Sequence, residues 1–198
     1  MFIIGITGGT GAGKTSASRA LKSLGAFVMD CDEIYHELLA DNTMLRTELD
    51  ARYGGVLAGG MIDRKRLGEI VWGDPSALLD LNTITHRYVN EEIEQRLAIW
   101  DAQGGTVAAI DAIALLESAI REKCDIVVGV TAPADIRLSR IMKRDGLSLE
   151  QAEMRMSAQK SAEFYKENCD YLLEGICDTS EEFEARCKDF FEDLLSKI

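Results

Sequence analysis

Residues 8–15 read Gly8-Gly9-Thr10-Gly11-Ala12-Gly13-Lys14-Thr15, and this stretch decides how the rest of the sequence is interpreted. It fits the phosphate-binding pattern G-x-x-x-x-G-K-[ST] without a mismatch. The apolar residues 2–6 before it predict a buried strand. Residues 14–24 after it predict a helix that ends at Gly25. A strand, a glycine-rich turn and a helix in this order are the context in which such a loop binds phosphate.

The chemistry of this loop follows from its residue types. Glycines let the backbone turn several N–H groups toward one anion, and the N-terminus of the following helix adds a favourable field. We expect Lys14 to contact the β- and γ-phosphates of ATP and to act in catalysis, and the Thr15 hydroxyl to bind Mg²⁺. The expected nucleotide-binding residues are Gly11, Ala12, Gly13, Lys14, Thr15, Ser16 and, further along the chain, Arg144.

The alternative is a glycine-rich turn without chemical meaning. Chance alone gives on the order of one match to the pattern per 150 chains of this length, before any context is required. Because the stretch also lies between a predicted strand and a predicted helix, we favour phosphate binding.

Strand and helix signals alternate along most of the chain. Besides the two elements around the loop, the patterns predict strands at 26–29, 106–110, 126–130 and 171–173, and helices at 34–40 and 133–144. Gly146 ends the second of these helices, and Ser148 with Gln151 has the spacing of a capping box for the next one. The order predicts an α/β fold of the P-loop NTPase type, with three α/β/α layers and a five-stranded parallel sheet.

The last helix should begin near Thr179 and pack on the core. At helical spacing its apolar residues form one face. They are Phe183, Cys187, Phe190, Leu194 and Ile198.

Residues 42–100 differ in character from the rest. Their helical patterns are broken at Gly54-Gly55, Gly59-Gly60 and Asp74-Pro75, and no convincing strand occurs. We interpret them as a helical insertion in a core formed by residues 1–41 and 101–198.

Composition narrows the possible partners. The 198 residues carry a net charge of −12, which disfavours nucleic-acid binding because that requires a basic surface. No stretch has the length or apolarity of a membrane span, and the first residues lack the basic flank of a signal peptide. We expect a cytoplasmic protein, a monomer, with its five cysteines reduced.

A regulatory GTPase is disfavoured by two missing motifs. Such a protein needs D-x-x-G after a strand, but the strand at 106–110 is followed by Asp111-Ala112-Ile113-Ala114. The nearest match to the guanine-binding motif, Glu122-Lys123-Cys124-Asp125, has the wrong first residue and precedes a strand. A small-molecule kinase remains, which needs an acid near Mg²⁺, a base near the acceptor hydroxyl and cations on the phosphoryl group.

Three acidic residues are candidates for the acid and the base. Asp111 ends a strand at the edge where ligands bind to parallel sheets, so it could organise Mg²⁺; otherwise it only turns the chain. Asp30 and Asp32 follow another strand, and in extended geometry they would point to the same side. Asp30 also suits a helix cap, with Glu33 at capping-box spacing. Asp32 is therefore the expected general base.

Basic residues gather on the helix at 133–144. Arg137, Arg140 and Arg144 fall on one face, where their guanidinium groups suit phosphate oxygens. The alternative is that they compensate the dipole at the helix C-terminus. That alternative fits Arg144 as well as function does, and it fits Arg140 less well. We therefore expect Arg140 to contact the phosphoryl group as a catalytic residue. With Arg155 and Lys160 the segment resembles a lid.

These motifs together resemble the dephospho-coenzyme A kinase family. The opening Gly5–Thr15 is similar to that family's, and Asp30-Cys31-Asp32 resembles its Asp-Ala-Asp. Further similar stretches lie at 62–67, 71–72, 81–86, 115–117, 140–148 and 155–159. Arg137 stands where the family usually has glutamine.

The resemblance implies ATP-dependent phosphorylation of the ribose 3′-hydroxyl of dephospho-coenzyme A, the last step of coenzyme A synthesis. It implies a nucleotide core, a helical acceptor domain at 42–100 and a lid at about 145–165. By position Asp32 matches the base, and Lys14 and Arg140 match phosphate contacts. The expected acceptor-binding residues are Asp32, Arg64, His86, Asp111 and Leu115. His86 could equally satisfy a buried hydrogen bond between helices.

Two other functions stay open at the level of sequence. The chain could be another P-loop kinase, acting on a nucleoside or on shikimate. It could also be a nucleotide-binding protein without catalytic activity, built on a kinase scaffold.

Overall fold

The structure, a computed structural model, describes all 198 residues and divides them into two compact units. The core unit comprises Met1–Met29 and Trp100–Ile198, and the inserted unit comprises Asp30–Ile99. The helix that follows the second strand therefore belongs to the inserted unit, whereas the sequence had suggested that the insertion begins at residue 42.

The core unit is built on a five-stranded sheet with the order β2-β5-β1-β6-β7. Its central strand β1 pairs in parallel with β5 and with β6, and Ile6 lies opposite both Asp111 and Val128. The predicted parallel α/β fold is confirmed. The strands are β1 (Phe2–Gly8), β2 (Phe27–Asp30), β5 (Val107–Asp111), β6 (Ile126–Thr131) and β7 (Tyr171–Glu174).

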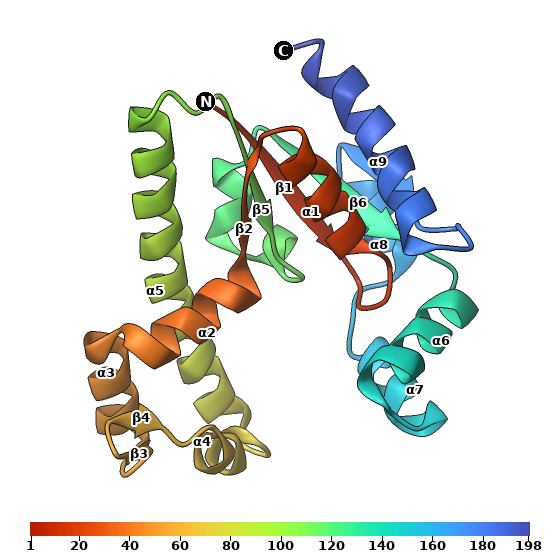
Figure 1. Cartoon of the computed structure of the whole chain (residues 1–198). Helices are drawn as coiled ribbons and strands as arrows, with labels where there is room; N and C mark the ends of the chain where they lie inside the picture. The colour runs from red at the N-terminus through yellow and green to blue at the C-terminus, as the bar shows by residue number, and fades with distance from the viewer. The chain divides into compact units, whose positions relative to one another are not determined.

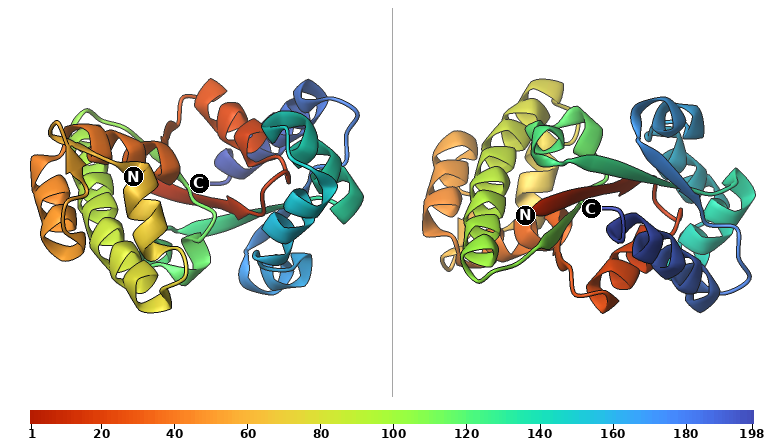
Figure 2. Two further views of the ribbon diagram at one scale, coloured as in Figure 1. Left: turned by 90° about the horizontal axis from the view of Figure 1, so that it is seen from below. Right: turned by 90° about the horizontal axis from the view of Figure 1, so that it is seen from above.

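Helices cover both faces of this sheet. Helices α1 and α9 lie side by side on one face, while α8 and the two short 3₁₀ helices lie on the other (Figures 1 and 2). The short elements α8, η1 and η2 were not predicted from the sequence. The core helices are α1 (Lys14–Ser23), η1 (Leu115–Glu117), η2 (Ala119–Lys123), α6 (Ala134–Asp145), α7 (Leu149–Ser157), α8 (Ala162–Asn168) and α9 (Ser180–Leu195).

The hydrophobic core lies between β1 and the helix pair α1–α9. Ile4 and Ile6 are fully buried there, and β-branched side chains of this kind suit a strand buried on both faces. The start of α9 at the cap Thr179 is confirmed. The predicted core-facing residues of α9 all pack on the core except Ile198.

Phe191 is fully buried and Phe190 only partly, because steps of four, four and three residues from Phe183 follow the 3.6-residue period through Phe191. Ile198 lies beyond the end of α9 and is 62% exposed.

The boundaries of α6 and α7 follow local signals. Gly146 adopts a left-handed conformation with φ of 65° and donates its N–H to the carbonyl of Met142, which ends α6. Ser148 and Gln151 form the predicted capping box at the start of α7. These two signals separate α6, which carries four basic residues, from α7, which carries two glutamates and one arginine.

The inserted unit is mainly helical. Its elements are α2 (Cys31–Asp41), α3 (Thr43–Tyr53), β3 (Leu57–Ala58), β4 (Met61–Ile62), α4 (Arg64–Val71) and α5 (Pro75–Ala102). The β3–β4 hairpin contradicts the prediction that this region has no strand. Leu57 pairs with Ile62 across the Gly59-Gly60 turn, and both glycines have positive φ. Two-residue strands are too short to show an alternating pattern.

Helix α5 continues into the core unit, where an aromatic contact holds its end. Trp100 stacks on Phe27 of β2 with ring centroids 5.4 Å apart, and its indole N–H donates to the carbonyl of Val107 at 3.0 Å. None of the helices is at once long enough and apolar enough to cross a lipid bilayer.

The position of Phe191 gives a test of this packing. We expect Phe191→Ala to lower the free energy of unfolding by about 3–5 kcal/mol, because it leaves a cavity between α9 and the sheet. Urea denaturation followed by circular dichroism measures the change. Phe190→Ala is the matched control and should cost roughly half as much, because Phe190 is already partly exposed. Equal losses of unfolding free energy in the two variants would contradict the rotation of α9 about its own axis that the structure shows.

Candidate active site

The turn between β1 and α1 forms a phosphate cradle. Gly8, Gly11 and Gly13 have φ of 146°, 78° and 113°, values that only glycine adopts readily. A Cβ on Gly13 would lie 2.7 Å from the Phe183 ring, so this position also needs glycine for space. No side chain caps the N-terminus of α1, and its first turn carries no acidic residue. The amide groups there remain suited to an anion.

The three residues that directly follow Gly13, the last glycine of the loop, have different surroundings. Lys14 Nζ donates to the carbonyl of Gly8 at 3.0 Å, so its side chain folds back over the loop. Thr15 is exposed. The nucleotide contact of Ser16 stays a prediction, and in this structure its hydroxyl has a partner in the protein. That group is buried and donates to the carbonyl of Ser180 at 3.3 Å, which ties α1 to α9.

Helix α6 holds the outer side of the loop. Arg140 Nη1 donates to the carbonyls of Gly11 at 3.2 Å and Ala12 at 3.4 Å, and its Nη2 donates to Gly175 at 2.9 Å. Arg137 Nε donates to the carbonyl of Thr10 at 3.0 Å. Both residues lie on one face of α6, as predicted. In this structure, however, the Arg140 guanidinium binds loop carbonyls, a role that differs from the predicted contact with the phosphoryl group.

The turn after β7 packs against the same loop. A Cβ on Gly175 would lie 2.2 Å from the carbonyl oxygen of Ala12, so a larger residue cannot fit without moving the loop. The N–H of Gly175 donates to the carbonyl of Thr131 at 2.7 Å. The phosphate loop is therefore held between α6 and the end of β7.

A carboxylate and a hydroxyl meet beside the first turns of α1. Asp111 ends β5 next to β1, is only 7% exposed, and accepts a 2.7 Å hydrogen bond from the Ser18 hydroxyl. Ser18 lies one turn after Thr15 on α1, so both hydroxyls are on the helix face near Asp111. No group of three or more His, Cys, Asp or Glu side chains could hold a metal ion by itself. One carboxylate and one hydroxyl suit an Mg²⁺ whose other ligands are phosphates and water.

The two aspartates at the end of β2 and the start of α2 have different roles. Asp30 caps α2 by accepting from the N–H groups of Asp32 and Glu33 at 2.8 and 3.2 Å, so the predicted helix cap is confirmed. The predicted extended geometry is wrong, because β2 ends at Asp30 and Asp32 lies in the first turn of α2. The Asp32 side chain is exposed.

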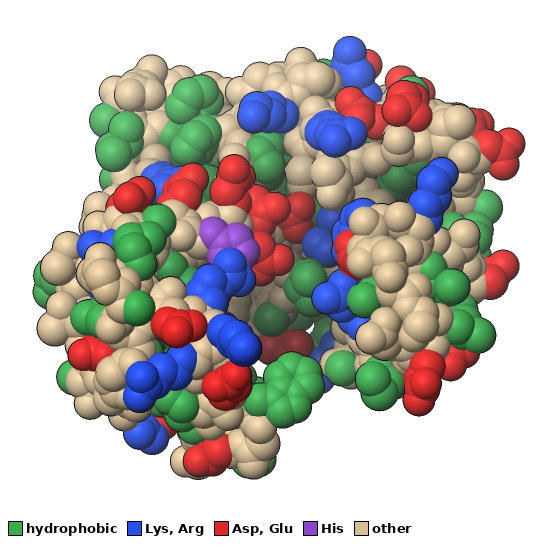
Figure 3. Space-filling view, turned by 60° about the horizontal axis from the view of Figure 1, so that its bottom comes forward, with side chains coloured by type: hydrophobic (Ala, Val, Ile, Leu, Met, Phe, Trp, Pro, Cys, Tyr) green, Lys and Arg blue, Asp and Glu red, His purple; other side chains and the backbone are tan.

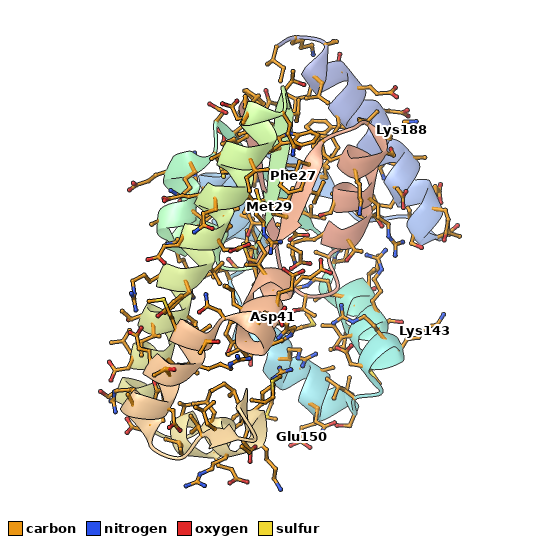
Figure 4. All side chains as sticks on the ribbon, turned by 60° about the vertical axis from the view of Figure 1, so that its left-hand side comes forward. Phe27, Met29, Asp41, Lys143, Glu150 and Lys188 are labelled. Carbon is orange, nitrogen blue, oxygen red and sulfur yellow. The ribbon has the colours of Figure 1, made fainter.

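Ion pairs organise the segment that follows α6. Asp145 accepts two hydrogen bonds from Arg144, at 2.7 and 2.9 Å, and one from Arg155 at 2.5 Å. The bonded Arg144 guanidinium lowers the pKa of the Asp145 carboxyl. The neighbouring Lys143 points away from the ribbon (Figure 4). Arg144 and Arg155 are exposed and are held together at the start of the proposed lid.

The residues predicted to bind an acceptor differ in exposure. Arg64, the first residue of α4, and His86 on α5 are exposed, so the alternative that His86 satisfies a buried hydrogen bond is wrong. Leu115 is fully buried beneath Gly5 of β1, so its side chain does not reach the surface, and its contact with the acceptor stays a prediction. On the face drawn in Figure 3, basic side chains form small separate groups among acidic ones.

Several site residues were not predicted from the sequence. Ser18 contacts Asp111 across 93 positions of the chain, and Gln159 contacts Thr10 across 149 positions. A hydroxyl residue one helical turn after Thr15 could have indicated Ser18. No pattern in the sequence pointed to the contact between Gln159 and Thr10.

The sheet order, the phosphate cradle and the carboxylate beside it define a P-loop kinase. Comparison with known proteins assigns the family. The family model described as dephospho-CoA kinase matches residues 2–180, and the chain belongs to this family.

Relatives agree with the assignment over the full length. The dephospho-CoA kinase of Thermobifida fusca is 34% identical over 200 residues, which cover 100% of this chain and 98% of the relative. The crystal structure of a Thermus thermophilus protein matches with a TM-score of 0.80 and 26% identity, covering 100% of this chain and 97% of that one. A dephospho-CoA kinase from Campylobacter jejuni matches in fold, with a TM-score of 0.64, 24% identity and 96% of each chain covered.

The contacts of Arg140 lead to a prediction that separates two roles. If Arg140 holds the loop, Arg140→Met should lower the midpoint of thermal unfolding without ligand by about 4–8 °C, because three carbonyls lose their donor. Differential scanning calorimetry measures the shift. Lys143→Met, which removes an exposed charge from the same helix, should leave the midpoint within about 1 °C. An unchanged midpoint for Arg140→Met would mean that the residue contributes only to ligand binding.

Proposed function

We propose that this chain is a dephospho-CoA kinase, which transfers the γ-phosphoryl group of ATP to the 3′-hydroxyl of the dephospho-CoA ribose and yields CoA and ADP. The match of the family model across residues 2–180, with an intact phosphate loop inside it, carries the proposal. The reaction makes the chain a phosphotransferase with an alcohol acceptor.

The core unit supplies the ATP site in this proposal. Loop amides from Gly11 to Thr15 would bind the phosphates, and Lys14 would move from the Gly8 carbonyl to the β- and γ-phosphates. Arg140 would keep the carbonyl side of the loop fixed while the amide side binds. Arg144, released from Asp145, is available to meet the nucleotide.

Thr15 and Asp111 are the residues that would hold Mg²⁺. The buried Asp111 carboxylate, fixed by Ser18, fits a shell in which the ion is bound through few protein ligands. When bound, Mg²⁺ neutralises charge on the β- and γ-phosphates. The protein's own contribution is to orient the carboxylate and the hydroxyl before the nucleotide arrives.

Asp32 is the proposed general base. Its carboxylate lies in the first turn of α2, near the start of the inserted unit in the sequence, and Asp30 fixes that turn by capping it. A carboxylate is an adequate base because phosphoryl transfer requires little proton removal before the transition state. The proton of the acceptor hydroxyl would pass to Asp32 as the oxygen bonds to phosphorus.

The inserted unit is the proposed acceptor domain, with Arg64 and His86 as exposed candidates for contact with dephospho-CoA. The segment at about 145–165 is the proposed lid, which would exclude water from the phosphoryl group. We propose a monomer that acts in the cytoplasm.

Acceptor dependence tests the proposed reaction. Protein mixed with ATP, Mg²⁺ and dephospho-CoA should release ADP, measured with a pyruvate kinase and lactate dehydrogenase couple. Without the acceptor, release should be at background. Shikimate and nucleosides serve as competing acceptors. Turnover with one of them, and none with dephospho-CoA, would assign the chain to another kinase specificity.

The role of the base is tested at one position. We expect Asp32→Asn to lower kcat by about 10²-fold or more while the dissociation constant for ATP stays unchanged, because the amide cannot accept the proton. Glu33→Gln, an exposed acid in the same helical turn, is the matched control and should keep kcat within about twofold. An unchanged kcat in Asp32→Asn would exclude this residue as the base. ATP binding without any acceptor-dependent turnover in the parent would indicate a non-catalytic nucleotide-binding protein.

A further inference from the structure

Side chains from two distant segments hold every polar group of Thr10, which lies within the phosphate loop. The Thr10 N–H donates to Gln159 Oε1 at 2.9 Å, and its hydroxyl accepts from Gln159 Nε2 at 2.6 Å. The Thr10 carbonyl accepts from Arg137 Nε at 3.0 Å. Arg137 Nη2 also donates to Gln159 Oε1, at 2.7 Å. We name this set of four hydrogen bonds among Thr10, Arg137 and Gln159 the clasp.

The clasp connects the loop to the proposed lid. Arg137 comes from α6, and Gln159 comes from the short connection between α7 and α8. The next residue, Lys160, forms a 2.8 Å ion pair with Glu117 of η1. The connection is therefore held to the phosphate loop by Gln159 and to η1 by Lys160. A movement of α7 would change the hydrogen bonds at Thr10.

Lys14 shows which end of the loop the clasp controls. Its ammonium group binds the Gly8 carbonyl, and in this motif that group reaches the β- and γ-phosphates. The arm Gly8–Thr10 therefore faces the γ-phosphate end of the cradle. The opposite end, around Gly13, leads into α1.

Glutamine suits the clasp for a chemical reason. Its amide oxygen accepts two N–H groups while its amide nitrogen donates to the Thr10 hydroxyl. Glutamate can replace the acceptor but adds a negative charge, and leucine can replace neither group. Arg137 is half-buried and burial lowers the pKa of its guanidinium, so its hydrogen bonds replace lost hydration.

We propose that Gln159 is a positioning residue that fixes the Gly8–Thr10 arm in the shape that accepts the γ-phosphate. Discrimination between ATP and ADP then depends on the clasp. The proposal rests on the proposed function, because it assumes that the loop binds ATP as phosphoryl donor.

The test compares two nucleotides in three variants without any acceptor. Isothermal titration calorimetry with Mg²⁺ and either a non-hydrolysable ATP analogue or ADP gives the two dissociation constants. Gln159→Leu should weaken the ATP analogue about tenfold and ADP less than about twofold. Gln159→Glu should keep the midpoint of thermal unfolding closer to that of the parent than Gln159→Leu does. It should still weaken binding of the ATP analogue, because its charge repels the γ-phosphate. Gln151→Leu disturbs the same lid without touching the loop, and should change the ratio of the two constants less than twofold.

Equal weakening of both nucleotides by Gln159→Leu, or weakening of neither, would overturn the proposal. If that variant does not fold, Thr10→Val removes one hydrogen bond of the clasp and should weaken the ATP analogue about threefold, with recovery in Thr10→Ser. A Thr10→Val variant that binds the ATP analogue and ADP with equally changed or unchanged dissociation constants would also overturn the proposal.

Turnover separates this proposal from the proposed function. A parent protein that releases ADP with dephospho-CoA, together with a Gln159→Leu variant whose KM for ATP is unchanged, would refute the role of Gln159 alone. A parent that binds the ATP analogue but never turns over would refute the proposed function and leave the clasp to be judged by the two dissociation constants.

Discussion

The structure depends on one backbone constraint at the phosphate loop. A loop that turns its N–H groups toward an anion must turn carbonyl groups outward, and these carbonyls need donors when they are covered by protein. Here the donors come from α6, through Arg137 and Arg140. The close packing of Gly175 on Ala12 then follows, because only glycine lets the turn after β7 reach the same side of the loop.

Because of this constraint, the arginines near the loop have two different roles. Arg137 and Arg140 stabilise the shape of the loop, whereas Arg144 and Arg155 are exposed and form ion pairs with Asp145. A negative net charge of −12 is therefore compatible with a phosphate site. The attraction for the anion is local, and it comes from oriented amides, a lysine and a few arginines.

Much of the fold could be predicted because its signals are local. The phosphate loop, the succession of strands and helices along the core, and the caps at Asp30, Gly146 and Ser148 each depend on a few neighbouring residues. The hairpin at Gly59-Gly60 could not be predicted, since its strands are only two residues long. Contacts between Gln159 and Thr10 depend on tertiary packing across 149 positions, which one sequence does not reveal. The site was therefore predicted as a list of residues, and only the structure showed how they are held.

Phosphorus NMR of the reaction mixture is the most direct measurement of whether an intact loop and a carboxylate base make this chain a dephospho-CoA kinase. With ATP, Mg²⁺ and dephospho-CoA, we predict that the γ-phosphate signal of ATP falls while a phosphomonoester signal coupled to the ribose 3′-proton rises in equal amount. Loss of the γ-phosphate signal to inorganic phosphate, or a new ester at a different hydroxyl, would contradict the proposed function.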